Sequence, residues 1–181
     1  MSDPLYQQLL GPAWAELSPS VRGAHAVESQ LESAGSFDIT HFQGWLARRA
    51  GMPPPGRSVP TNLRIIRRGD KEEWSRTFGQ FPLNSIQYAR DGLLGERFGR
   101  MEFWCKLEVR DGGICFLQRR AAICFGRRSL PLPVWVSPQV VGTEMPGRTA
   151  DETRVCVSVS LRLIGKIFEY QGLMKIAEAV Q

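Results

Sequence analysis

The sequence has no apolar stretch close to the roughly 18 residues that a helix needs to cross a bilayer. Residues Met1 to Pro4 have neither a basic start nor an apolar core, so we expect no signal peptide and a cytoplasmic location. No glycine-rich phosphate loop joins a strand to a helix, which argues against nucleotide binding. No catalytic triad is legible, and no pair of carboxylates has the spacing of a glycosidase or protease. Catalysis, if present, is not carried by a local motif.

Lysine is scarce: of the 23 basic residues four are lysine and 19 are arginine, against 18 acidic residues, which gives a net charge of +5. A nucleic-acid interface would gather basic side chains on one element with aromatic residues between them. Here the arginines are spread out, and several occur as doublets that alternate with apolar residues or end an element. We therefore interpret them as solvated strand edges and helix ends, and we expect no nucleic-acid partner. The doublets are Arg48-Arg49, Arg67-Arg68, Arg119-Arg120 and Arg127-Arg128.

Cysteine and histidine are also few. Cys105, Cys115, Cys124 and Cys156 are separated by 9, 8 and 31 residues, which matches no zinc pattern, and neither histidine is near them in the sequence. In a cytoplasmic chain we interpret such cysteines as small apolar side chains within strands, and a catalytic thiol is the alternative. We expect no disulfide, no metal site and no cofactor.

Alternation of apolar and polar residues is the strongest pattern in the chain. It runs from about Leu63 to Tyr170, and Gly, Asp or Pro interrupts it at intervals. Such alternation is typical of antiparallel strands with one buried face. A weaker segment at 27–37 could be a further strand. The predicted strands are Val59–Arg67, Glu72–Gly79, Asn84–Arg90, Leu93–Phe98, Met101–Arg110, Gly113–Phe125, Val140–Pro146, Thr153–Leu163 and Lys166–Gly172.

Helices are predicted only near the N-terminus. Asp3-Pro4 can cap a first helix, and Ser18-Pro19 can start a short second one ending at His25. A third is predicted over Ile39–Arg49, with Phe42, Trp45 and Leu46 on its buried face. Leu130-Pro131-Leu132-Pro133 cannot lie within the sheet, and we expect a loop or a short helix there.

These elements predict an α+β, mainly β fold. It is an antiparallel β-barrel or strongly curved sheet with two or three N-terminal helices at one mouth. We assign residues 1–181 to a single ligand-binding-type domain. Small side chains at Ala122, Cys124, Ser158 and Ser160 suggest that the barrel interior is not filled.

Five phrases of the sequence together resemble a known family. They are Pro19–His25 (Pro-x-x-Arg-x-x-His), Trp74–Phe78 (Trp-x-Arg-x-Phe), Glu96–Gly99, Leu130–Pro133, and Leu163-Ile164-Gly165 with Tyr170-Gln171-Gly172. From Leu5 to Leu173 the chain resembles the bacterial domain of unknown function family four-one-six-six. The resemblance implies one fold unit and, because members often follow a nucleotide-binding dehydrogenase-like domain, a dehydrogenase-like partner. Where the family has an Arg-Gly-rich strand, this chain has Glu32-Ser33-Ala34-Gly35-Ser36.

Arg22 and His25 are the first candidate site residues. On a short helix they are one turn apart and would share a face, where a guanidinium lowers the pKa of the imidazole and favours a neutral base or donor. The alternative is that both bind loop carbonyls and anchor the helix at the barrel rim. His41 has no patterned partner, and we expect it on the surface.

Arg76 and Glu96 are the second pair. Strand alternation puts Arg76 on the face of Trp74 and Phe78, and Glu96 on the face of Leu94 and Phe98. An arginine on an apolar face needs an anion, which is either Glu96 in a structural pair or a carboxylate- or enolate-bearing ligand.

Tyrosines and polar residues on further strands complete the candidates. Tyr88 and Tyr170 could each direct a hydroxyl into a cavity or pack in the core with the hydroxyl at the rim. Gln118 and Arg120 suggest a partly polar lumen, unless the long strand bulges between them and Ile114.

The leading hypothesis is therefore a small-molecule-binding barrel for an apolar or carboxylate-bearing molecule, with Arg22, His25, Arg76, Glu96 and Tyr170 as polar anchors. An enzyme of this kind would be a cofactor-independent cyclase or isomerase that confines a reactive conformer. The alternative is a non-catalytic interaction or accessory domain that binds a dehydrogenase-like protein. An interior cavity with inward polar groups would favour the container, and a filled core with an exposed apolar patch would favour the interaction domain.

Overall fold

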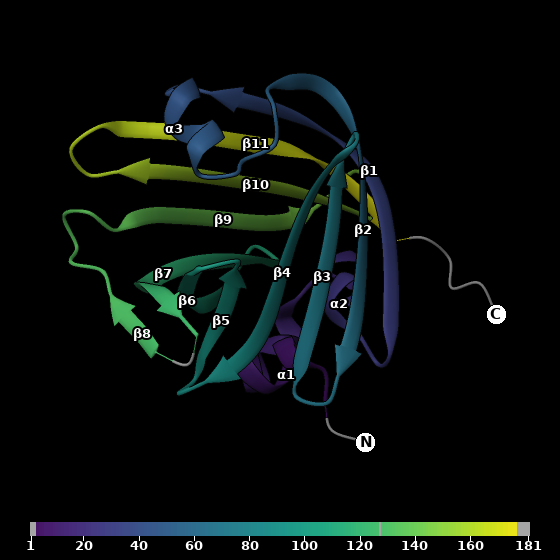
Figure 1. Cartoon of the computed structure of the whole chain (residues 1–181). Helices are drawn as coiled ribbons and strands as arrows, with labels where there is room; N and C mark the ends of the chain where they lie inside the picture. Colours follow the sequence, from purple (N-terminus) through teal and green to yellow (C-terminus); the bar gives the residue numbers. More distant parts are fainter. Residues whose placement is uncertain (1–2, 127, 177–181) are drawn as a thin grey trace.

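Ten strands follow one another around a closed antiparallel barrel, and an eleventh, β8, is added at its edge (Figure 1). The computed structural model describes residues 3–126 and 128–176. The order is β6-β5-β4-β3-β2-β1-β11-β10-β9-β7-β8, and pairing of β6 with β7 closes the ring. The strands are β1 (Gln30–His41), β2 (Gly56–Arg68), β3 (Lys71–Phe78), β4 (Phe81–Arg90), β5 (Leu93–Phe98), β6 (Met101–Arg110), β7 (Gly113–Phe125), β8 (Arg128–Pro131), β9 (Pro138–Pro146), β10 (Glu152–Leu161) and β11 (Gly165–Ile176).

The predicted barrel is confirmed because nearly every strand pairs with its sequence neighbour through a short turn. At Asp91-Gly92 and Asp111-Gly112 both turn residues have positive φ, from 51° to 72°. This conformation matches the right-handed twist of the flanking strands, and Asp-Gly adopts it at low cost. Gly69-Asp70 and Gly99-Arg100 likewise join consecutive strands, β2 to β3 and β5 to β6.

Two N-terminal helices and a 3₁₀ helix close one end of the barrel. They are α1 (Leu5–Leu10), η1 (Gly11–Glu16) and α2 (Pro19–His25). Ser18 Oγ accepts a hydrogen bond from the Val21 amide and caps α2, as its sequence suggests. The Ser18 amide donates to the carbonyl of Gly112 in the β6–β7 turn, 2.9 Å away, which ties the helices to the barrel. We call this the helix end and the opposite one the far end.

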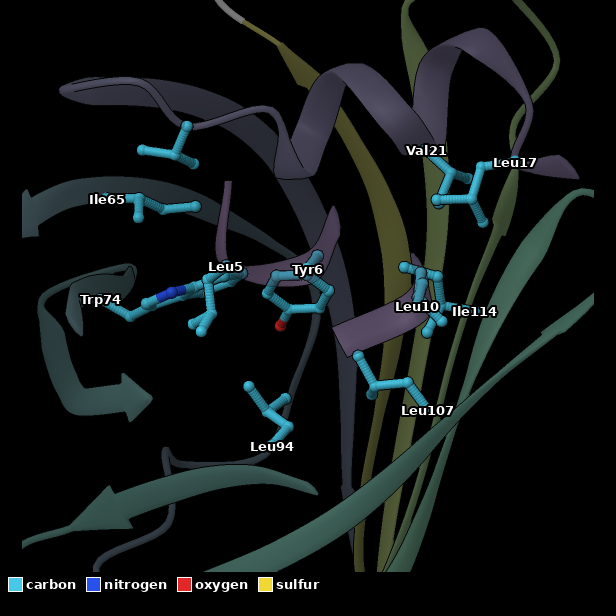
Figure 2. Close-up of a cluster of buried hydrophobic side chains, with 11 residues drawn as sticks. Leu5, Tyr6, Leu10, Leu17, Val21, Ile65, Trp74, Leu94, Leu107 and Ile114 are labelled. Carbon is cyan, nitrogen blue, oxygen red and sulfur yellow. The ribbon is translucent and has the colours of Figure 1, made fainter. Parts of the chain in front are cut away.

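The main apolar core lies at the helix end. In Figure 2 the side chains of Tyr6 and Leu10 from α1 lie between Trp74 on one side and Ile114 on the other. Leu17, which directly follows η1, and Val21 on α2 pack against the same core. Burial of these side chains stabilises the helices, which are too short to form alone.

The predicted helix over Ile39–Arg49 is half wrong. Residues up to His41 belong to β1, where Ile39 pairs with Tyr170, and α3 comprises only Gly44–Arg49. Phe42 and Trp45 are exposed rather than buried, while Ala47 is the buried residue of α3. Pairing with β11 therefore outweighs the helical pattern of this segment. His41 is half-buried rather than on the surface, and its Nε2 donates to the carbonyl of Pro53.

The long strand β7 is irregular midway, as expected from its length. Its pairing with β6 shifts between Trp104 and Cys105, and its pairing with β9 ends at Leu117–Val141. Beyond that point β7 pairs with β8, so Leu130-Pro131 forms an edge strand rather than a loop or helix. An edge strand tolerates proline because one side of it is unpaired. Arg127, from one predicted doublet, lies outside the described residues.

Candidate functional site

A cavity of about 150 Å³ lies inside the barrel above the helix end. Tyr6 and His25 form part of its floor, and its walls are largely aromatic because alternate residues of each strand point inward. An engineered apolar cavity of about 150 Å³ holds a molecule the size of benzene. The aromatic wall residues are Phe37, Trp74, Phe78, Phe98, Phe103, Phe116 and Tyr170.

Arg76 and Glu96 form the predicted inward-facing pair. Arg76 Nη2 donates to Glu96 Oε1 over 3.1 Å, and Arg76 Nη1 donates to Ser85 Oγ over 2.9 Å. Ser85 Oγ in turn donates to Glu96 Oε1 over 2.7 Å. The two charged side chains are 13% and 21% exposed and line the cavity. This network across β3, β4 and β5 is a polar strip on an otherwise apolar wall.

Aromatic rings surround the guanidinium of Arg76. Its central carbon lies 4.7 Å from the centre of the Trp74 ring and 5.8 Å from that of Phe98. These rings stabilise the cation without replacing its hydration, so the guanidinium keeps an electrostatic preference for an anion or a carbonyl oxygen. Tyr170 is nearby. Burial raises the pKa of its phenol to about 12, although the charge of Arg76 opposes the rise. The phenol is therefore a hydrogen-bond donor at neutral pH.

His25 and Glu144 form a second polar pair at the cavity floor. His25 Nε2 is 2.9 Å from Glu144 Oε2, and the side chains are 1% and 11% exposed. Burial opposes ionisation of Glu144, but the charge and hydrogen bond of His25 and a hydrogen bond from Thr153 lower the pKa of Glu144 below its ordinary value. Glu144 is thus ionised, and His25 Nε2 donates to it.

The other nitrogen of His25 is a buried atom without a hydrogen-bond partner among the described residues. The imidazole ring stacks on Tyr6, with ring centres 3.8 Å apart. Tyr6 is itself fixed because its hydroxyl donates to Gln87 Oε1 over 2.8 Å. Nδ1 is an acceptor in the neutral ring whose Nε2 carries the proton, and a donor in the protonated ring.

Glu72 is a further buried carboxyl group, at the helix end of β3. Trp74 Nε1 donates to its Oε2 over 3.1 Å, whereas its Oε1 has no partner in the described part of the chain. Burial raises the pKa of Glu72, although Trp74 and the charge of His25 oppose this. Glu72 does not line the cavity, and we assign it no role there.

Four of the five candidate site residues line the cavity: His25, Arg76, Glu96 and Tyr170. Arg22 is half-buried and lies outside the cavity wall, and the partner of His25 is Glu144 rather than Arg22. The short α2 directs the two side chains differently, so sharing a helical face does not bring them together here.

The residues expected to leave the lumen open do not line it. Val155 and Val157 face the cavity from β10, whereas Ser158, Ser160, Ala122 and Cys124 lie outside its wall.

Three polar side chains expected near the lumen are also elsewhere. Tyr88 donates to Glu102 away from the cavity wall. Gln118 binds the backbone of Pro138 and Val140, and Arg120 is exposed over the Trp104 ring. Neither Gln118 nor Arg120 lines the cavity, so the expectation of a polar lumen from them is wrong. The register shift in β7 lies between these two residues.

Sequence reasoning missed Ser85, Gln87, Glu144 and Tyr6. Ser85 and Gln87 stand on the face of β4 opposite Ile86 and Tyr88. Alternation along the strand could therefore have identified them as residues that share one face. Glu144 and Tyr6 gave no such signal, because only the closure of the barrel on its helices brings them together.

The fold and cavity define a class: a ten-stranded antiparallel β-barrel with an internal, mostly aromatic cavity. Residues 17–174 match the model of the domain of unknown function DUF4166, and the chain belongs to that family. No curated protein matches the sequence.

Similar solved structures include a heat-soluble SAHS protein from Ramazzottius varieornatus. It has 12% identity and a TM-score of 0.41, with 80% of this chain and 91% of that chain covered. GphF dehydratase 1 has 10% identity and a TM-score of 0.21, with 82% and 77% covered. Likenesses this weak carry no argument about function.

Two features are absent from the described residues, 3–126 and 128–176. These residues contain no helix long and apolar enough to cross a membrane. They also contain no cluster of three or more His, Cys, Asp or Glu side chains placed to hold a metal ion.

Proposed function

We propose that the barrel binds a compact, mostly apolar small molecule that carries one oxygen acceptor, a carbonyl or a carboxylate. The observation that carries this proposal is the aromatic cavity of about 150 Å³ with Arg76 on its wall. Aromatic walls favour a flat apolar body, and the guanidinium and the Tyr170 hydroxyl favour an oxygen at one end. The cavity is smaller than typical ligand pockets of about 300–1,000 Å³, so the ligand is about the size of one ring.

Binding is tested with benzoate, benzaldehyde and benzene as probes, measured by saturation-transfer NMR. Val157→Phe places a ring in the cavity and should abolish binding of all three. Ser158→Phe is the matched control, because the neighbouring residue does not line the cavity. Circular dichroism checks that both variants are folded. If none of the three probes binds, or if the two variants bind them alike, the cavity is not the binding site.

A second candidate function, isomerisation by proton transfer, is favoured by the His25–Glu144 pair at the floor of the same cavity. In this proposal His25, oriented by Glu144, takes a proton from carbon next to the ligand carbonyl, and Arg76 stabilises the enolate oxygen. Returning the proton to another carbon completes an isomerisation without a cofactor. A cyclisation held by the same walls remains within this proposal.

The proton-transfer proposal is tested by deuterium exchange of cyclopentanone in D₂O, followed by NMR. Wild-type protein should accelerate exchange, and both His25→Gln and Glu144→Gln should abolish the acceleration. His41→Gln is the control, since His41 lies outside the cavity wall. Exchange at the buffer rate with the wild type would exclude this chemistry for simple ketones.

The accessory-domain alternative, with a dehydrogenase-like partner, is favoured by one observation. Exposed apolar side chains gather at the far end of the barrel, and a patch of this kind often marks an interaction surface.

The cytoplasm remains the proposed location, and the absence of any disulfide among the four cysteines fits a reducing compartment.

A further inference from the structure

The exposed large apolar side chains of this protein are concentrated at the far end of the barrel. Trp45 and Trp135 are each 61% exposed there, and Leu163 is 80% exposed. They belong to three segments, 42–49, 130–136 and 162–166, which we call the apolar rim. Its exposed large apolar residues are Phe42, Trp45, Leu130, Val134, Trp135, Val136, Leu163 and Ile164.

The three segments of the apolar rim lie side by side. The amides of Phe42 and Gln43 both donate to the carbonyl of Ile167, which joins the first segment to the β10–β11 turn. Leu161 at the end of β10 pairs with Pro138, the residue that follows the β8–β9 connection. Figure 1 shows α3 at the upper left and the β10–β11 turn and the β8–β9 connection below it at the left, all away from α1 and α2.

The charge of the apolar rim has one sign. Its 20 residues include Arg48, Arg49, Arg162 and Lys166 and no aspartate or glutamate. Lys166 pairs with Glu169 on β11, but none of the ion pairs in the described part of the chain includes the three arginines. All three are exposed.

We propose that the apolar rim docks on the surface of an anionic lipid bilayer. Tryptophan and leucine side chains on loop tips insert at the level of the headgroups, and arginines beside them bind lipid phosphates. A bilayer surface of this kind offers an apolar layer for the exposed side chains of the rim and negative charge for its arginines. This proposal does not depend on the cavity ligand, because it uses no residue of the cavity wall.

Two features favour a bilayer over a protein partner. The exposed apolar residues stand on three separate segments: α3 with the residue Phe42 before it, the end of β8 with the turn after it, and the β10–β11 turn. Basic residues flank them without acidic neighbours inside the rim, and this suits a uniformly negative surface.

Cosedimentation with vesicles tests the proposal. Wild-type protein should bind vesicles of phosphatidylcholine and phosphatidylglycerol about a hundredfold more tightly than vesicles of phosphatidylcholine alone, since each basic side chain near an anionic surface contributes about fivefold. Arg48→Gln/Arg49→Gln/Arg162→Gln should abolish this preference. The matched control, Arg90→Gln/Arg154→Gln/Lys175→Gln, removes three exposed charges at the helix end and should keep it.

The apolar contribution has its own control. Trp45→Ser/Trp135→Ser/Leu163→Ser should release the protein from anionic vesicles. Ile86→Ser/Val141→Ser removes exposed apolar side chains from the barrel side and should not. Brominated lipid should quench wild-type tryptophan fluorescence, and Trp45→Phe/Trp135→Phe should remove that quenching.

Three results would overturn the proposal. The first is wild-type protein that stays in the supernatant with both kinds of vesicle. The second is equal loss of binding in the rim variants and their controls. The third is a dimer in gel filtration that the rim variants dissociate while vesicle binding is absent, which would make the rim a contact between two copies of the chain.

Discussion

Removing the charge of Arg76 should destabilise the barrel, and removing the charge of Glu96 as well should restore much of the loss. Both side chains are more than three-quarters buried and share Ser85 as a hydrogen-bond partner. Breaking a buried ion pair costs about 3–5 kcal/mol, because one charge is left without compensation. Since the pair retains some exposure, we expect about 3 kcal/mol for Arg76→Met and a similar loss for Glu96→Leu.

The double variant should lose only about 1–2 kcal/mol, because no buried charge remains and only the bonds of Ser85 are missing. Two independent losses would instead give roughly 6 kcal/mol. For a chain of this length the Arg76→Met loss corresponds to a fall in Tm of about 6–12 °C. Urea unfolding followed by far-UV circular dichroism measures the free energies, since the fluorescence of the adjacent Trp74 would change for other reasons.

Arg68→Met, at the end of the neighbouring strand β2, is the matched control. Arg68 pairs with Glu73 at 3.2 Å, but both side chains are largely exposed, so its loss should cost less than about 1 kcal/mol. If Arg76→Met behaves like Arg68→Met, water already solvates the inner pair. If the double variant loses the sum of the single losses, the two residues are not coupled and the described network has no energetic role.

Three further predictions concern stability. Because burial raises the pKa of Glu72, its ionisation costs stability as pH rises above the ordinary value of 4.5. Glu72→Gln should therefore raise Tm at pH 8, and a gain that persists at pH 3.5 would contradict this cause. Gly172→Ala should cost more than about 3 kcal/mol, because its Cβ would lie 2.1 Å from the carbonyl oxygen of Ser36. Gly44→Ala meets no atom within 4 Å and should be neutral or stabilising, as urea titration can check. The cysteines form no disulfide, so Tm should be the same with and without reductant; a difference would reveal a bond absent from this structure.

The strand pattern was predictable because alternation and turn chemistry are local. Asp91-Gly92 and Asp111-Gly112 specify tight turns by their own conformational preferences. Once each hairpin is fixed, alternation along the strand places Trp74 and Arg76 on the same face of the sheet. The helical pattern of the segment from Ile39 failed because its pairing partner, β11, is more than 120 residues away in the sequence.

The candidate site was predictable only in part, for the same reason. Arg76 and Glu96 lie on strands separated by one other strand. Knowing that alternation turns both side chains inward was therefore enough to pair them. His25 and Glu144 lie 119 residues apart, and no local rule relates a helix at the barrel end to β9.

The sequence by itself determined the strands, their turns and which side chains face inward, because these depend on neighbours within a few residues. Only the tertiary structure decided how the ring closes, with β1 on β11 and β7 on β9. That closure sets the volume of the cavity, brings His25 to Glu144, and gathers the three distant segments of the apolar rim at one end. Each of these results depends on contacts between residues far apart in the chain, whose geometry is fixed by packing rather than by local preference.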